Sequence, residues 1–334
     1  MKHITILLML ILLIFSACEP LQTPPPEVTP QVTDSESAQN QPPEPYPLES
    51  EAPVGGHYPP ETATVEPELP SETQARVPTN PPVPELPTDV TPGEMVEIAG
   101  GTFLMGCDPD NNAGSNCPGS ESPAHEVALP TYFIDRYEVT NGQYKQCVDA
   151  GACRAPLTKA SRTRTDYYGN PDFDAYPVVN VSFSDAKTYC EWADLRLPSE
   201  AEWEFAARSS EANLYPWGSR EPDCTLANSV NNLNATPCVG DTTMVGSYPE
   251  GASAFGVMDM AGNVWEWVAD YYSPEYYSVS PTEAPFGPVS GSERVVRGGG
   301  WSNNWVFLRS SARAYDLPFF SGFDLGFRCA ADMD

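Results

Sequence analysis

The sequence predicts that residues 93–334 form an irregular α+β domain. Only three segments of this part combine a helix cap with enough length for a helix, which is few for a domain of this size. The remainder consists of short strand patterns separated by loops rich in Gly, Asn, Tyr and Trp. Strands and helices do not alternate as in a parallel-sheet protein, and no repeat of about 20–50 residues is present.

The N-terminus has the features of an export signal. A short basic start precedes an apolar run, residues 4–15, which is too short to span a bilayer and is followed by small residues. Cys18 then stands where a bacterial lipobox has its lipidated cysteine. We therefore expect residues 1–17 to be a signal peptide and Cys18 to anchor the protein to a membrane. Phe15 departs from the usual lipobox leucine, so an ordinary signal peptide with a chance cysteine is the alternative.

Residues 19–92 are expected to be a disordered linker rich in Pro, Glu and Thr. They contain 20 of the 37 prolines of the chain, together with 13 acidic residues and one basic residue. Such a segment cannot bury enough apolar surface to fold, and its proline runs favour extended polyproline II. It would act as a spacer between a membrane and the domain. A ligand for proline-recognising modules is the less favoured reading.

The charge of the domain limits the choice of partner. Residues 93–334 carry 33 acidic and 15 basic residues, which gives a net charge of −18. This charge argues against a nucleic-acid partner and is compatible with cation binding and with solubility outside the cell.

The elements of the domain follow from local patterns in chain order. Short alternating segments predict the first strands, and Thr140 with Gln143 forms a capping box for a helix that runs to about Ala150. Ser199 and Glu202 form a second capping box. The strands expected here are 95–98, 101–105, 125–129 and 132–135, and the two later helices run from Ser184 through Trp192 and from the Ser199 cap through Arg208.

Eight cysteines lie within the domain, an even number that indicates up to four disulfides in an oxidising compartment. Short spacings favour three local pairs, which leave a fourth, although spacing alone does not determine the connectivity. The pairs expected are Cys107–Cys117, Cys147–Cys153, Cys224–Cys238 and Cys190–Cys329.

Residues 255–270 form the most informative stretch of the chain. Asp259, Asn263 and Glu266 crowd oxygen donors around a Gly-Asn turn, and two tryptophans flank the glutamate. Such a turn suits a hard cation such as Ca²⁺, which takes six to eight oxygen ligands. The alternative is a turn that only anchors two core tryptophans.

The same stretch carries a family resemblance. Asp259-Met-Ala-Gly-Asn-Val-Trp-Glu-Trp267 resembles the most recognisable motif of the formylglycine-generating-enzyme (sulfatase-modifying factor) family. The resemblance implies a C-type-lectin-like fold with long loops, stabilised by calcium and by disulfides that include Cys190–Cys329. Further family motifs occur in the expected order: Met105-Gly106, Tyr137-Glu-Val-Thr-Asn141, Tyr176-Pro-Val-Val-Asn-Val-Ser182, Arg196-Leu-Pro-Ser-Glu-Ala-Glu-Trp-Glu204, Pro216-Trp-Gly218, Arg297-Gly-Gly299 and Leu325-Gly-Phe-Arg-Cys-Ala330.

The resemblance also implies two calcium sites. The first combines side-chain and backbone oxygens of the motif, with an aspartate in place of the asparagine of the family. The second takes one asparagine and a downstream aspartate, which is a looser match because the intervening loop is shorter. The residues at these positions are Asp259, Gly262, Val264 and Glu266 in the first site, and Asn228 and Asp241 in the second.

The catalytic positions of the family differ in this chain. Active members bind copper(I) through two cysteines that follow Arg-Gly-Gly-Ser, and with O₂ they convert a sulfatase cysteine to formylglycine. Alignment from Arg297 places Gly300 at the serine, and Asn303 and Leu308 at the two cysteines. We therefore do not expect copper chemistry. His125 is the sole histidine of residues 93–334, so a site with several histidine ligands is not expected either.

The remaining functional surface implied by the resemblance is a binding groove. Its aromatic, amide and basic side chains suit a peptide or glycan. In the alternative reading the tryptophans belong to the core and the arginines pair with nearby acids. The groove residues are Trp301, Asn303, Asn304, Trp305, Arg309 and Arg313.

Three functions are compatible with these features. The first is an exported, lipid-anchored envelope protein whose calcium-stabilised domain binds or scaffolds an unknown peptide, protein or glycan, without copper oxidase activity. The second is a divergent formylglycine-generating oxidase. The third is a purely structural envelope protein.

Overall fold

The computed structural model describes residues 93–112, 114, 116–232 and 234–333. The signal peptide, Cys18 and the linker predicted for residues 1–92 lie outside the described residues and stay predictions. No helix in these described ranges has both the length and the apolar character needed to cross a membrane.

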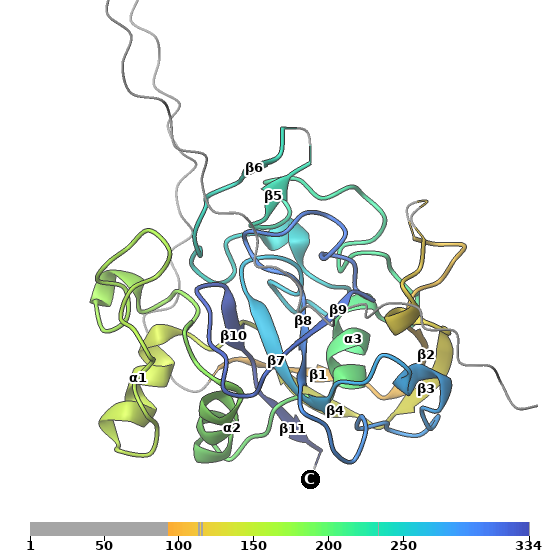
Figure 1. Ribbon diagram of the computed structural model, residues 1–334, viewed down its shortest axis with the longest axis horizontal. Coiled ribbons are helices and arrows are strands. Elements are labelled where there is room, and N and C mark those ends of the chain that lie inside the picture. The colour runs from red at the N-terminus through yellow and green to blue at the C-terminus, as the bar shows by residue number, and fades with distance from the viewer. Residues whose placement is uncertain (1–92, 113, 115, 233, 334) are drawn as a thin grey trace, which may run out of the picture. The chain divides into compact units, whose positions relative to one another are not determined.

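The domain is built from short strands, three α-helices and many loops (Figure 1). The strands are β1 (Met95–Ile98), β2 (Gly101–Met105), β3 (His125–Leu129), β4 (Tyr132–Asp135), β5 (Val230–Asn231), β6 (Thr236–Pro237), β7 (Trp265–Tyr271), β8 (Arg294–Arg297), β9 (Arg313–Asp316), β10 (Leu325–Phe327) and β11 (Ala330–Asp332). The α-helices are α1 (Asn141–Asp149), α2 (Phe183–Trp192) and α3 (Glu200–Arg208), and the 3₁₀ helices are Gly119–Glu121, Pro171–Phe173, Pro249–Gly251 and Tyr276–Ser278.

Two sheets organise these elements. The larger has the order β10-β7-β8-β9, in which β10 runs parallel to β7 and the other pairs are antiparallel. The second has the order β1-β4-β11, and β2 pairs with β3 as a separate hairpin. The C-terminal strands β10 and β11 thus lie at edges of different sheets. Residues 325–332 therefore join the two sheets.

The three predicted helices are confirmed, together with the caps predicted for two of them. Thr140 and Gln143 form the capping box of α1, and Ser199 and Glu202 form that of α3. Helix α2 begins at Phe183, one residue before the predicted start, because Ser182 caps it with Asp185 at the third position.

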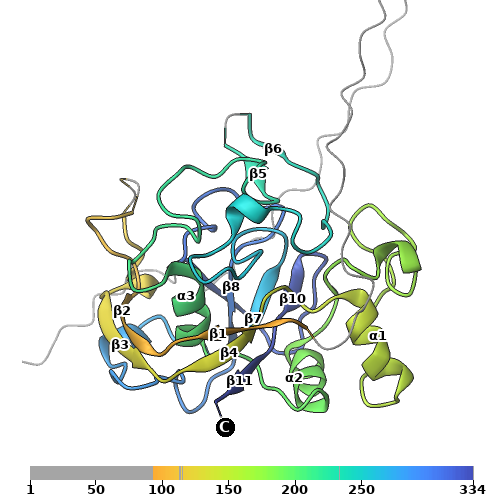
Figure 2. The same cartoon turned by 180° about the vertical axis from the view of Figure 1, so that it is seen from behind.

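Two apolar clusters fill the interior. One surrounds α3, which lies between the β2–β3 hairpin and the larger sheet, as both views show (Figures 1 and 2). The rings of Phe103 and Phe205 are 4.9 Å apart in this cluster. The other lies between α1, α2, β7 and β10, where Tyr144 stacks on Tyr189 and Trp267 is fully buried. The irregular α+β architecture is therefore confirmed.

The four predicted disulfides are also confirmed. Cys107–Cys117, Cys147–Cys153 and Cys224–Cys238 close local loops, whereas Cys190–Cys329 connects α2 with the segment between β10 and β11. All eight cysteines within the described ranges are thereby oxidised.

Candidate functional site

A buried arginine binds the backbone of the loop between β8 and β9. Arg297 is fully buried and forms an ion pair with Glu204 at 2.6 Å (Nη2 to Oε2). It also donates to the carbonyl oxygens of Ser310, Ser311 and Ala312. One guanidinium therefore shapes the end of the loop that carries the predicted groove residues.

Two of these groove residues have the internal role that the alternative reading describes. Arg309 is 1% exposed and forms a two-bond ion pair with Glu121 at 2.7 and 2.9 Å. Arg313 is 7% exposed and pairs in the same way with Glu200 at 2.8 and 2.7 Å. Both guanidinium groups lie inside the protein, where each compensates the charge of a buried carboxylate. Leaving such a carboxylate unpaired would be energetically costly. They are therefore not available to a ligand at the surface.

The two positions aligned with the copper-binding cysteines have structural contacts of their own. The Asn303 side-chain oxygen accepts from the Gly300 amide at 2.9 Å, and the Asn303 carbonyl accepts from the Val230 amide at 2.9 Å. Leu308 is fully buried in a small apolar cluster with Leu214, Tyr215 and Ala261. One position thus fixes the loop backbone, and the other fills the core beneath it.

The remaining groove residues differ in exposure. Trp301 is 9% exposed, and its indole N–H donates to the Phe323 carbonyl at 3.4 Å. Asn304 is exposed, and its side-chain oxygen accepts from the Val306 amide. Trp305 is half-buried and lines a pocket. Of the two tryptophans, Trp305 is thus the one that faces an open space.

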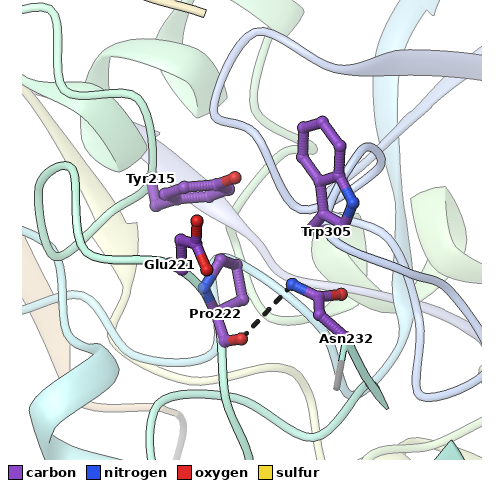
Figure 3. A pocket seen from close by; sticks show the side chains of 5 residues that line it. All are labelled: Tyr215, Glu221, Pro222, Asn232 and Trp305. Carbon is purple, nitrogen blue, oxygen red and sulfur yellow. Dashed lines mark hydrogen bonds between the residues drawn. The ribbon is translucent and has the colours of Figure 1, made fainter. Parts of the chain in front are cut away.

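This pocket of about 210 Å³ lies between the loop after α3 and the loop between β8 and β9. Figure 3 shows the rings of Tyr215 and Trp305 on one side, and Glu221, Pro222 and Asn232 on the other. The Asn232 amide N–H donates to the Pro222 carbonyl at 3.4 Å. The ring of Tyr215 stacks on that of Trp217, with 5.4 Å between the ring centroids and 10° between the ring planes. This contact fixes the position of the Tyr215 ring.

The residues of the first predicted calcium site lie in a cluster of buried carboxyl groups. The Glu266 carboxylate is fully buried and accepts from Arg328 at 2.7 Å through each oxygen, and from the Trp203 indole at 2.8 Å. Asp259 is 6% exposed and accepts from the Gly246 amide at 2.6 Å. Glu138, also buried, accepts from the Asn263 amide group and the Val264 backbone amide.

Two of the carboxyl groups, Asp259 and Glu138, have perturbed pKa values. Burial raises the pKa of Asp259 to about 6; the Gly246 N–H and Arg328 lower it, and Glu266 raises it further. Burial, reinforced by Asp259 and Glu266, raises the pKa of Glu138 well above its usual range. One guanidinium does not compensate three buried carboxylates, so a cation at this place would be favoured electrostatically.

The second predicted site is close to the first. Asn228 donates to the Asp241 carbonyl at 2.8 Å and to the Asn263 side-chain oxygen at 3.2 Å. Its own side-chain oxygen is buried and has no partner among the residues that the structure describes. The Asp241 carboxylate accepts from Ser161 and Thr163 and lies 3.1 Å from Arg164. Burial alone would raise the pKa of Asp241, but these hydrogen bonds hold it below its usual value. Asn228 therefore offers an oxygen to a cation, whereas Asp241 is already satisfied.

The two predicted sites meet at the Gly262-Asn263 turn, whose Asn263 amide donates to the Asn228 carbonyl at 2.8 Å. In the part of the chain that the structure describes, no three His, Cys, Asp or Glu side chains converge as a metal-binding group. Any cation at the turn would therefore depend on amide and backbone oxygens as well as carboxylates.

Comparison with known proteins decides the family. The model of the sulfatase-modifying factor enzyme 1-like domain matches residues 81–333. The chain belongs to this family. The domain thus has the C-type-lectin-like fold of formylglycine-generating enzymes, as expected from the sequence motifs. It also contains the four disulfides that were predicted.

Similar proteins share the domain but differ in name and length. The formylglycine-generating enzyme of Streptomyces coelicolor is 33% identical over 299 residues, covering 72% of this chain and 90% of that protein. Serine/threonine-protein kinase Pkn1 of Chlamydia trachomatis is 37% identical over 253 residues, and the match spans 72% of this chain but 38% of the kinase. The structure of PvdO from Pseudomonas aeruginosa aligns with a TM-score of 0.61 at 30% identity, covering 72% of this chain and 95% of PvdO.

Four residues of these two places, Tyr215, Glu221, Asn232 and Glu138, were not predicted as site residues from the sequence. Tyr215 directly precedes the quoted Pro-Trp-Gly motif, and Glu138 lies within the quoted Tyr-Glu-Val-Thr-Asn motif, so both had a local signal. Glu221 and Asn232 lie in loops without a motif, and only the fold brings them to Trp305.

Proposed function

We propose that this protein is a binding module of the sulfatase-modifying factor family that does not act as a copper oxidase. The observation that supports this most directly is the state of its cysteines. All eight in the described ranges form disulfides, and the two aligned copper positions are an asparagine and a buried leucine. A soft metal such as copper(I) prefers thiolate or thioether ligands.

The test is a metal analysis of the purified full chain, followed by oxygen consumption with a sulfatase-type cysteine peptide after copper(I) loading. The Streptomyces coelicolor enzyme, treated in parallel, is the positive control. We expect no stoichiometric copper and no aldehyde. Copper bound at one ion per chain with aldehyde formation would establish the alternative, a divergent formylglycine-generating oxidase.

We also propose that at least one Ca²⁺ stabilises the domain around the Gly262-Asn263 turn. Support comes from the buried carboxylates Asp259 and Glu138, whose charge Arg328 does not balance, and from the unpartnered oxygen of Asn228. A bound cation would supply charge and coordination there and stabilise the surrounding loops. Dialysis against Ca²⁺ followed by metal analysis should give bound calcium, and chelation should lower the melting temperature. The proposal fails if the melting temperature is the same in calcium and in chelator.

The place of action is a further part of the proposal. A lipid on Cys18 would anchor the protein to the cell envelope, with the domain outside the cytoplasm. Metabolic labelling with a fatty-acid analogue should label the full chain and not the Cys18→Ser variant. Equal labelling of both would contradict lipidation at this residue, and release of unlabelled protein into the medium would indicate export without an anchor.

A further inference from the structure

We propose that the pocket between Tyr215 and Trp305 binds a primary ammonium group, as carried by a lysine side chain of a peptide or protein. This inference rests on the proposed binding function and names the chemical class of its ligand. The pocket of about 210 Å³ suits the end of one side chain better than a complete drug-sized ligand.

The pocket has one charged acceptor. Within the described part of the chain, the Glu221 carboxylate has neither a hydrogen bond nor an ion pair, although it lines the pocket. The Asn232 amide N–H is directed to Pro222. An ammonium group supplies three N–H donors and a positive charge, so it matches the Glu221 carboxylate.

The half-buried Trp305 favours a cation as well. Its indole lines the pocket (Figure 3), and an ammonium over such a face is stabilised by about 0.5–2 kcal/mol. Tyr215 is 1% exposed and stacks on Trp217, so it forms the rigid base of the pocket and offers little surface to a ligand. An anion would meet the Glu221 charge, and a neutral ligand would lose the charge-assisted hydrogen bonds.

The charge of Glu221 acts within the pocket. Burial raises the pKa of the Tyr215 phenol to about 12; the positive charge of Arg309 lowers it, and the Glu221 carboxylate raises it further. Arg309 is held by Glu121 beneath the loop, so it does not neutralise Glu221. Glu221 is therefore the charged side chain that a ligand in the pocket meets directly.

The experiment uses the full chain and two probes of matched shape, N-acetyl-lysine methylamide and its neutral counterpart N-acetyl-norleucine methylamide. Binding is followed by isothermal titration calorimetry and, in the proteins that retain Trp305, also by the NMR shift of its indole N–H. We expect the lysyl probe to bind about 10-fold or more tightly than the norleucyl probe, with affinity falling as salt is added.

Three variants locate the effect. Glu221→Gln should lose about 10-fold in affinity for the lysyl probe and leave the norleucyl probe unchanged, and Trp305→Ala should weaken both probes. Glu126→Gln removes the same charge from an exposed position of β3 that does not line the pocket, and should have no effect. Near-ultraviolet circular dichroism confirms that each variant is folded.

Equal affinity for the two probes, or no binding of either, would overturn the inference, as would an unchanged lysyl affinity in Glu221→Gln. The proposed function is decided separately by the copper and oxygen measurements. Aldehyde formation would refute that function whatever the probes do, and loss of lysine selectivity alone would leave the binding module without a known ligand class.

Discussion

The buried carboxyl of Asp135 makes the stability of the domain depend on pH in an unusual direction. Asp135 is 3% exposed at the end of β4. One oxygen accepts from the Cys329 amide at 2.8 Å, and the other has no partner within the described ranges of the chain. Burial raises its pKa from 3.8 to about 7; the Cys329 N–H and Arg328 lower it, and Glu266 raises it further.

The folded protein therefore keeps this proton up to about pH 7, whereas the unfolded chain loses it near pH 3.8. Between these values the folded state binds more protons, so the free energy of unfolding falls as pH rises. A shift of roughly 3 pH units corresponds to a loss of about 4 kcal/mol, complete above pH 7.

The perturbation is Asp135→Asn, which stays neutral and retains an oxygen for the Cys329 amide. We expect variant and wild type to have similar stability near pH 4, and the variant to become more stable by up to about 4 kcal/mol above pH 7. Urea unfolding with intact disulfides, in chelator, measures both curves. Buried carboxyls that do not interact with Asp135 contribute equally to both proteins and cancel in the difference. A difference that does not change with pH would refute the reasoning.

Three further predictions concern stability and are checked by denaturant unfolding. Gly262→Ala should lower the free energy of unfolding by about 2–4 kcal/mol, because at φ +82° the new methyl group would lie 2.5 Å from the Asn228 carbonyl oxygen. The control Gly169→Ala has a similar φ of +83° but open space around the new methyl, and should lower it by about 1 kcal/mol. Equal losses would contradict the steric argument. Arg309→Met should cost about 3–5 kcal/mol because it leaves the Glu121 carboxylate buried and unpaired, and a loss below about 1 kcal/mol would show that the pair is dispensable. Cys329→Ala removes the disulfide that closes a loop of 139 residues and should lower the free energy of unfolding by about 5 kcal/mol. Cys153→Ala opens a loop of 6 residues and should lower it by about 2 kcal/mol, because a shorter loop restricts the unfolded chain less. The reverse order would contradict this explanation.

The local elements could be predicted from the sequence because each has a local cause. The strand 101–105 is visible as a short run that contains the strand formers Thr102 and Phe103 and follows a glycine turn. The α1 and α3 helices begin at Ser or Thr with Gln or Glu three residues later. Strand partners could not be predicted in the same way. The adjacent strands β1 and β2 do not pair with each other but with β4 and β3, because partner choice depends on non-local packing.

The candidate site was predicted less completely. Trp305 was recognised because an aromatic residue beside the aligned catalytic positions suggested a ligand surface. Arg309 and Arg313 could not be distinguished from surface arginines, since the sequence does not show that Glu121 and Glu200 lie opposite them. Likewise, Glu266 has the local pattern of a metal ligand, while its two-bond partner Arg328 is far along the chain.

The position of residues 325–332 has a consequence for the order in which the protein can be made. This short segment supplies β10 to one sheet and β11 to the other, and it carries Arg328 and Cys329, the partners of Glu266 and Cys190. The segment is synthesised after all the strands and helices that it joins. Neither sheet can therefore be completed before residues 325–332 have left the ribosome. Such late folding would keep the preceding part of the domain unfolded long enough to be threaded through a translocation channel, as the predicted export signal requires.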